Sequence, residues 1–126
     1  MTKTAWVFPG QGSQAIGMGA DLLNLPTAKA KFELAKEILG WSVAEVCQKE
    51  EAKLSRTLYT QPCLFVIESI LADLVREKSD RPAVVAGHSL GEYVALYAAG
   101  VFDFETGLRL VKRRAELMDT ASGGQM

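Results

Sequence analysis

A serine with a glycine two positions away on either side, in the run from Gly87 to Gly91 (GHSLG), constrains the fold of this chain more than any other feature. The apolar run Ala83–Ala86 precedes it, and helical spacing follows it to about Gly100. A buried strand, a sharp turn and a helix in this order predict an α/β fold with a parallel sheet. Ser89 then lies at the carboxyl end of a strand, where such sheets bind their ligands.

The N-terminal residues show the same order of elements. Thr4–Phe8 is a short β-branched and aromatic run followed by a proline and a glycine, which predicts a second buried strand and a glycine-rich turn. Further on, Thr27 is predicted to cap a helix that runs to about Leu39, with Gly40 as its stop. Both glycine-rich turns are therefore expected at the same edge of the sheet.

The rest of the chain is predicted to be helical. Residues 43–58 are polar and only weakly helical in pattern. In residues 61–78 apolar side chains occupy most of the helical circumference, with Ser69 in a narrow polar face, so this helix is expected to be mostly buried. Asp103 is predicted to cap a last helix that runs to about Met118.

Composition excludes several classes of protein. The 14 Lys and Arg nearly balance the 15 Asp and Glu, so the chain has no electrostatic reason to bind nucleic acid or an anionic membrane. The apolar runs are short and no signal segment is recognisable, which predicts a cytoplasmic protein with no membrane span. Residues 1–126 are expected to form one domain or part of one. Cys47 and Cys63 match no metal-ligand spacing and are expected to be reduced core thiols.

The glycines around Ser89 suit the strained strand-to-helix elbow with which acyl-transfer enzymes expose a nucleophile. Gly87 and Gly91 carry no side chains that would collide as the backbone reverses. The N–H of Leu90, at the start of the next helix, is expected to stabilise a tetrahedral oxyanion, a contribution of about 3 to 4 kcal/mol. The alternative is a tight glycine turn whose serine caps the helix.

Arg114 breaks the pattern of the last helix. At about 100° per residue it projects from the apolar side of residues 104–119. A guanidinium keeps its charge, so its burial demands an anionic partner, ideally a carboxylate. One candidate is Glu68, which also falls on the apolar side of its helix, and the other is the carboxylate of a substrate. The residues by themselves favour neither candidate.

The first glycine-rich turn, from Gly10 to Ala15 (GQGSQA), also fits the G-x-G-x-x-A pattern of dinucleotide-binding turns. That interpretation requires a second strand ending in an acidic residue about 20 positions on, whereas residues 27–39 have helical spacing. The favoured interpretation is that the turn brings the N–H of Gln11 opposite that of Leu90 to complete an oxyanion hole.

A serine nucleophile also needs a general base, and the chain contains one histidine, His88. Because His88 is adjacent to Ser89, its ring is expected to point away as the backbone turns and to shape the elbow. Elbow enzymes place their catalytic histidine after the serine in chain order, so the base is expected beyond residue 126.

Three motifs together resemble the malonyl-CoA:acyl carrier protein transacylase family. They are FPGQGSQ at residues 8–14, YTQP at 59–62 and GHSLGE at 87–92, and their order and spacing agree with that family. The resemblance runs from residue 1 to 126. It implies an α/β-hydrolase-like core with a small ferredoxin-like subdomain inserted after the arginine-bearing helix. The chain would stop at the start of that insertion, in the small-residue tail from Ala121 to Met126, as an N-terminal fragment of the catalytic domain.

The resemblance also implies a reaction and roles for individual residues. Ser89 would take malonyl from malonyl-CoA as an ester and pass it to the phosphopantetheine thiol of acyl carrier protein. Arg114 would bind the malonyl carboxylate, and Gln11 and Leu90 would form the oxyanion hole through their N–H groups. The residues that would shape the elbow are Gly87, His88 and Gly91.

The same resemblance implies a monomeric enzyme of fatty acid biosynthesis with no metal and no resident cofactor. Two other functions stay open from the residues. One is an α/β-hydrolase-type esterase or thioesterase, which transfers the acyl group to water. The other is a non-catalytic fragment that lacks its histidine and keeps only an interaction surface.

Overall fold

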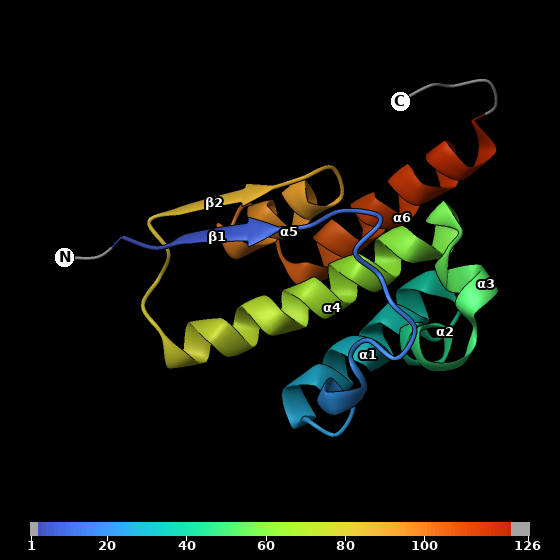
Figure 1. Cartoon of the computed structure of the whole chain (residues 1–126), viewed down its shortest axis with the longest axis horizontal. Coiled ribbons are helices and arrows are strands. Elements are labelled where there is room, and N and C mark those ends of the chain that lie inside the picture. Colours follow the sequence, from blue (N-terminus) through green and yellow to red (C-terminus); the bar gives the residue numbers. More distant parts are fainter. Residues whose placement is uncertain (1–2, 122–126) are drawn as a thin grey trace.

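Two parallel strands, β1 (Ala5–Phe8) and β2 (Val84–Gly87), form the sheet in the computed structural model, which describes residues 3–121 (Figure 1). Ala5 pairs with Val84 and Phe8 with Gly87, so the two strands end at the same edge. These are the two runs predicted from the sequence, and the glycine-rich loops that follow them leave the sheet side by side. The predicted small-residue tail, apart from its first residue Ala121, lies outside the described residues.

Helices make up the rest of the described chain. In chain order they are η1 (Ala20–Leu22), α1 (Pro26–Leu39), α2 (Val43–Lys49), α3 (Glu51–Leu54), α4 (Thr57–Lys78), α5 (Gly91–Ala98) and α6 (Phe104–Thr120). The long helix α4 crosses the middle of the molecule and contacts every other α-helix, while α5 packs on both strands (Figure 1). The protein is therefore a mixed α/β structure with a small parallel sheet, as predicted.

The ends of two helices show how local sequence positions them. α1 begins at Pro26, one residue before the predicted Thr27 cap, because a proline in the first turn loses no hydrogen bond and its fixed φ suits a helix. Gly40 ends α1 in the left-handed conformation with a φ of 85°. The Asp103 carboxylate accepts from the Thr106 N–H at 2.8 Å and caps α6, as predicted.

Helix α4 differs most from its prediction. It begins at Thr57 rather than near Gln61, and it passes through Pro62. Every residue from 60 to 70 is buried, including Ser69, for which the pattern wrongly predicted a polar face. Because helices pack around α4 on several sides, they supply contacts that outweigh the hydrogen bond lost at Pro62 and cover the expected polar stripe.

By length and composition alone α4 is able to cross a membrane, because an 18-residue window of it has a mean hydropathy of 1.4. The short apolar runs of the sequence did not reveal this property. Core helices of soluble proteins pass the same test, and 67% of this window is buried inside the protein. The burial of α4 is that of a core helix.

The strands are less buried than predicted. Val7 is 72% exposed and Val84 is 58% exposed, whereas Phe8 is buried. Successive side chains of a strand point to opposite faces, and in the described chain the helices cover only the face of Phe8. The prediction of fully buried strands is therefore wrong for the other face.

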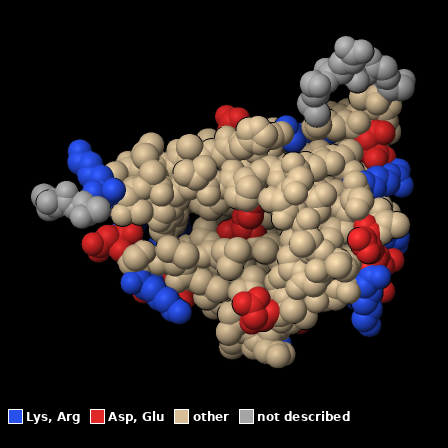
Figure 2. Space-filling view, in the orientation of Figure 1, with Lys and Arg blue, Asp and Glu red and all other residues tan. Residues whose placement is uncertain are grey.

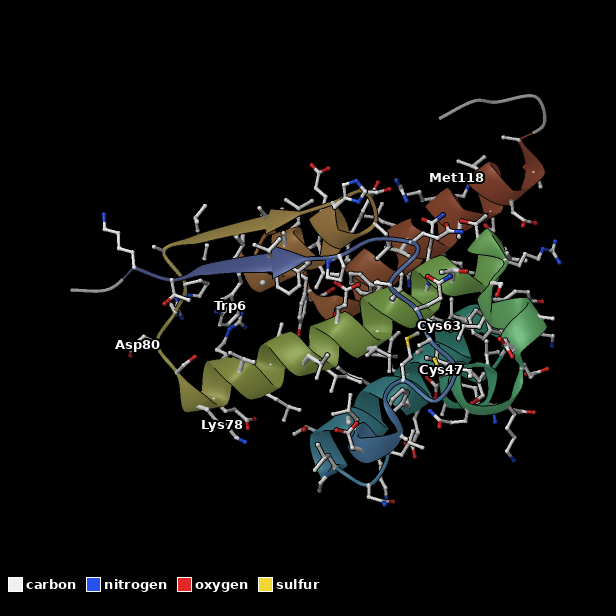
Figure 3. The ribbon with its side chains drawn as sticks, in the orientation of Figure 1. Trp6, Cys47, Cys63, Lys78, Asp80 and Met118 are labelled. Atoms are coloured by element: carbon white, nitrogen blue, oxygen red, sulfur yellow. The ribbon has the colours of Figure 1, made fainter. Side chains whose placement is uncertain are left out.

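Cys47 of α2 and Cys63 of α4 point toward each other in the core (Figure 3). Both thiols are free and buried, as predicted. A hydrogen bond to Cys47, together with burial, raises the pKa of the Cys63 thiol. A thiol with a raised pKa is a poor nucleophile, which fits a role for Cys63 in core packing and not in chemistry.

Candidate active site

The turn after β2 has the geometry of a nucleophile elbow. Ser89 has a φ of 56° and is the one non-glycine residue with a positive φ among residues 3–121. The chain enters α5 immediately afterwards, where the Gly91 N–H donates to the His88 carbonyl at 3.0 Å. A non-glycine residue in this conformation stores about 1 to 3 kcal/mol of strain, which surrounding structure must hold in place.

Close backbone contacts explain the glycines around the serine. A Cβ on Gly91 would collide with the Phe8 carbonyl, and a Cβ on Gly87 would collide with the main chain of Gly91. In the neighbouring loop, a Cβ on Gly10 would collide with the His88 carbonyl. Gly87 therefore lets the backbone reverse without a collision, as predicted, while Gly10 and Gly91 let the two loops pass directly against each other.

Ser89 does not cap the helix that follows it. Leu90 occupies the N-cap position of α5, and no side chain accepts a hydrogen bond from its first amides. The alternative of a simple glycine turn with a capping serine is therefore wrong. Ser89 instead lies in the wall of a cleft of about 410 Å³. The cleft is lined by Gln11, Thr57, Gln61, His88, Ser89, Leu90, Arg114 and Met118.

The backbone N–H groups of Gln11 and Leu90 donate to no acceptor within the described part of the chain. The next N–H in the first loop is occupied, because Gly12 donates to Gln14 Oε1 at 2.7 Å. Gln11, Leu90 and Ser89 line the same cleft. An acyl oxygen bound beside Ser89 would meet two free donors, which an oxyanion hole requires. The oxyanion role of both residues stays a prediction.

Arg114 reaches the cleft from α6 and is held by three contacts. Its Nη1 donates to Gln61 Oε1 at 2.6 Å, and its Nη2 donates to Ser89 Oγ at 3.3 Å. The guanidinium carbon lies 5.4 Å from the centroid of the Tyr93 ring, a cation–π contact. Its positive charge thus stands beside the serine hydroxyl and pairs with no carboxylate of residues 3–121.

The pair between Arg114 and Glu68 that the sequence allowed is not formed. Both carboxylate oxygens of Glu68 are buried with no hydrogen-bond partner among the described residues, as is the neighbouring Ser69 hydroxyl. Burial raises the pKa of the Glu68 carboxyl from 4.5 to about 8, because water no longer solvates its charge. Glu68 is therefore not the anionic partner of Arg114.

His88 takes part in the elbow through its backbone. Its N–H donates to the Phe8 carbonyl at 3.0 Å, and its carbonyl accepts from the helix that follows. Its ring makes no hydrogen bond to Ser89 Oγ, whose one side-chain partner in the described residues is Arg114. A general base is thus not seen among residues 3–121, and the histidine expected beyond residue 126 stays a prediction. Those same residues place no group of three or more His, Cys, Asp or Glu side chains to bind a metal ion.

Thr57 and Gln61 also line the cleft, and neither was predicted from the sequence as a site residue. Gln61 is 1% exposed, and its Nε2 donates to Thr57 Oγ1 at 2.7 Å. The Thr57 hydroxyl in turn donates to Gln11 Oε1 at 2.8 Å. The sequence did carry a signal for Gln61, which stands in a mainly apolar helix. A buried amide needs hydrogen-bond partners, so polar groups were to be expected beside it.

An ion pair braces the rim of the cleft. Arg56, just before α4, donates to both carboxylate oxygens of Asp119 near the end of α6, at 3.0 and 2.6 Å. It joins the helix ends that carry Thr57 and Met118, and Figure 3 shows Met118 at this end of α6. In the face drawn in Figure 2, basic side chains lie around the edge, whereas acidic side chains lie both around the edge and within the face.

Comparison with known proteins relates this cleft to a family of enzymes. Residues 5–126 match the acyl transferase domain family. The malonyl CoA-acyl carrier protein transacylase of Synechocystis is 69% identical over 124 residues, which are 98% of this chain and 42% of that protein. The protein of the same name from Escherichia coli is 42% identical over 96% of this chain and 40% of its own length.

Solved structures match as well. The crystal structure of the Synechocystis malonyl-CoA:ACP transacylase has a TM-score of 0.94 at 69% identity, covering 98% of this chain and 42% of that one. A type II PKS acyl-carrier protein in complex with its malonyl-transacylase matches with a TM-score of 0.86 at 42% identity, covering 93% and 39%. The chain therefore spans about two fifths of the length of these relatives and shares their fold over that span.

Proposed function

Because this chain belongs to the acyl transferase domain family, we propose that the full-length protein transfers malonyl from malonyl-CoA to the phosphopantetheine thiol of acyl carrier protein, in fatty acid biosynthesis. The observation that carries the proposal is the meeting of the Ser89 hydroxyl, the Gln11 and Leu90 N–H groups and the Arg114 guanidinium in one cleft. The names of the similar proteins support the choice of donor and acceptor.

In this proposal Ser89 is the nucleophile. Its oxygen attacks the thioester carbonyl of malonyl-CoA, its proton passes to a general base, and the carbon–sulfur bond breaks to release coenzyme A as the thiol. The phosphopantetheine thiol then attacks the malonyl ester and frees the Ser89 hydroxyl again. Two such half-reactions predict ping-pong kinetics. The general base is expected to be a histidine beyond residue 126.

The other cleft residues act on the two ends of the malonyl group. The N–H groups of Gln11 and Leu90 donate to the oxygen that becomes negative in each tetrahedral intermediate, and each donor contributes about 3 kcal/mol. The Arg114 guanidinium binds the free carboxylate through its planar fork of donors. An acetyl group has no carboxylate for this guanidinium to bind.

The proposal includes features that lie beyond these residues. We expect an α/β-hydrolase-like core with a ferredoxin-like subdomain inserted after α6, in a monomeric, cytoplasmic enzyme. The reaction as written needs no metal or prosthetic group on this protein, because coenzyme A and the carrier protein supply the thiols.

Mass spectrometry of the full-length protein after incubation with malonyl-CoA tests the proposal. We expect one malonyl group on Ser89, and its transfer to the carrier protein thiol on addition of that partner. Ser89→Ala should abolish the adduct, whereas Ser79→Ala, a matched change at an exposed serine after the far end of α4, should leave it. An adduct that survives Ser89→Ala would refute the mechanism, and transfer to water in preference to the thiol would favour an esterase.

A further inference from the structure

A line of hydrogen bonds joins the guanidinium of Arg114 to the loop that carries Gln11. Arg114 Nη1 donates to Gln61 Oε1 at 2.6 Å. Gln61 Nε2 donates to Thr57 Oγ1 at 2.7 Å, and Thr57 Oγ1 donates to Gln11 Oε1 at 2.8 Å. The four residues come from α6, the first turns of α4 and the loop after β1. All of them line the cleft that contains Ser89.

The charge at one end sets the direction of every hydrogen bond in this line. A guanidinium only donates, so Gln61 must present its carbonyl oxygen to Arg114 and its amide nitrogen to Thr57. The opposite orientation of the Gln61 amide would bring two donors face to face at Arg114. Because the Thr57 hydroxyl accepts from Gln61, its single proton is free to point at Gln11.

Burial makes this arrangement of hydrogen bonds unfavourable to disturb. Gln61 is almost completely buried, so its Nε2 has no solvent to replace a lost partner. Its other contact, to Met118 Sδ at 3.4 Å, is with a weak acceptor. Thr57 is only half buried and faces the cleft, so a substitution is able to remove its hydroxyl without opening the core.

We propose that Thr57 is a positioning residue that couples the carboxylate-binding arginine to the oxyanion loop, an inference that rests on the proposed function. Through Gln61 it holds the Arg114 guanidinium in one orientation, and through the Gln11 side chain it holds the loop whose N–H meets the acyl oxygen. Its hydroxyl touches no reacting atom. An acyl group with a carboxylate contacts both the Arg114 guanidinium and the Gln11 loop, whereas an acyl group without a carboxylate contacts only the Gln11 loop.

Loading of Ser89 from malonyl-CoA and from acetyl-CoA, measured on the full-length protein, tests this role. Thr57→Val removes the hydroxyl at nearly constant volume, and Thr57→Ser keeps it as the matched control. We expect Thr57→Val to lower kcat/KM roughly tenfold for malonyl-CoA and only about two- to threefold for acetyl-CoA. Thr57→Ser should stay within about twofold of wild type for both.

A double-mutant cycle with Arg114→Ala separates coupling from a purely structural role. In the Arg114→Ala background, Thr57→Val should lower malonyl loading by no more than about two- to threefold, because the group it positions is gone. The inference is overturned if the two effects simply multiply, or if Thr57→Val lowers malonyl and acetyl loading equally.

Two controls keep the outcome unambiguous. If circular dichroism shows that Thr57→Val does not fold, Thr57→Ala deletes the same hydroxyl with less bulk and takes its place in the cycle. A wild type that loads no malonyl refutes the proposed function itself. A wild type that loads malonyl, with variants whose effects multiply, refutes only the role of Thr57.

Discussion

Glu68 offers a direct measure of how strongly the interior of this protein disfavours a charge. Its two carboxylate oxygens are buried without partners among the described residues, and burial raises its pKa from 4.5 to about 8. Glu68→Gln replaces the carboxyl with an amide of nearly the same shape that does not ionise. We predict that this substitution removes a large pH dependence from the free energy of unfolding.

The sign follows from proton binding. Between pH 4.5 and about 8 the folded protein keeps a proton on Glu68 that the unfolded chain has released. The free energy of unfolding therefore falls as pH rises through this interval, by about 1.4 kcal/mol per pH unit. Over the whole interval the loss is on the order of 4 to 5 kcal/mol. Outside it, both states carry the same charge on Glu68, so the effect levels off.

Urea unfolding of the wild type and of Glu68→Gln, at a series of pH values spanning this interval, measures the difference. The gap between the two unfolding free energies should widen steadily in favour of Glu68→Gln as pH rises. Glu77→Gln, an exposed position on the same helix, is the matched control and should follow the wild type. Parallel curves for the wild type and Glu68→Gln would refute the reasoning, because Glu68 would then ionise as readily as an exposed carboxyl.

Other predictions address the site and the core. In the full-length protein, Arg114→Ala should lower malonyl loading a hundredfold or more, because the malonyl carboxylate loses its charged partner. Acetyl loading should fall only a few-fold, because only the contact of Arg114 with the Ser89 hydroxyl is lost. Equal losses in a loading assay would contradict a role in carboxylate binding. Gly91→Ala should lower the free energy of unfolding by about 1 to 3 kcal/mol, because its Cβ collides with the Phe8 carbonyl. Gly100→Ala should lower it less, because a Cβ there meets nothing and only the φ of 81° is unfavourable. Thermal unfolding that ranks the two variants the other way would contradict the collision at Gly91. Cys47 and Cys63 should react with a thiol reagent only after denaturation, and rapid labelling of the folded protein would show that they are accessible.

The elbow is predictable from sequence because it depends on residues that are neighbours along the chain. An apolar run followed by GHSLG leaves few backbone paths, and the strained turn at Ser89 and the need for a glycine at residue 87 are those that the spacing implied. The same is true of Gly40 at the end of α1. In each case the deciding contacts lie within a few residues or with the paired strand.

The partner of Arg114 was not predictable in this way. Helical periodicity placed both Arg114 and Glu68 on apolar sides and made a buried pair reasonable, but periodicity carries no information on which turns of two helices face each other. In the folded chain Arg114 lies opposite Gln61, 53 residues away in sequence, and Glu68 lies alone two turns further along α4. The exposure of Val7 escaped prediction for the same reason, because the strand pattern does not say how many layers cover it.

The sequence by itself thus determined the strand, elbow and helix around Ser89, since backbone sterics over a few residues decide them. Only the tertiary structure decided which polar groups share the cleft. The link from Arg114 through Gln61 and Thr57 to Gln11 joins segments that are remote in sequence. Those groups meet because α4 and α6 pack side by side, and that packing depends on apolar surfaces contributed by several parts of the chain.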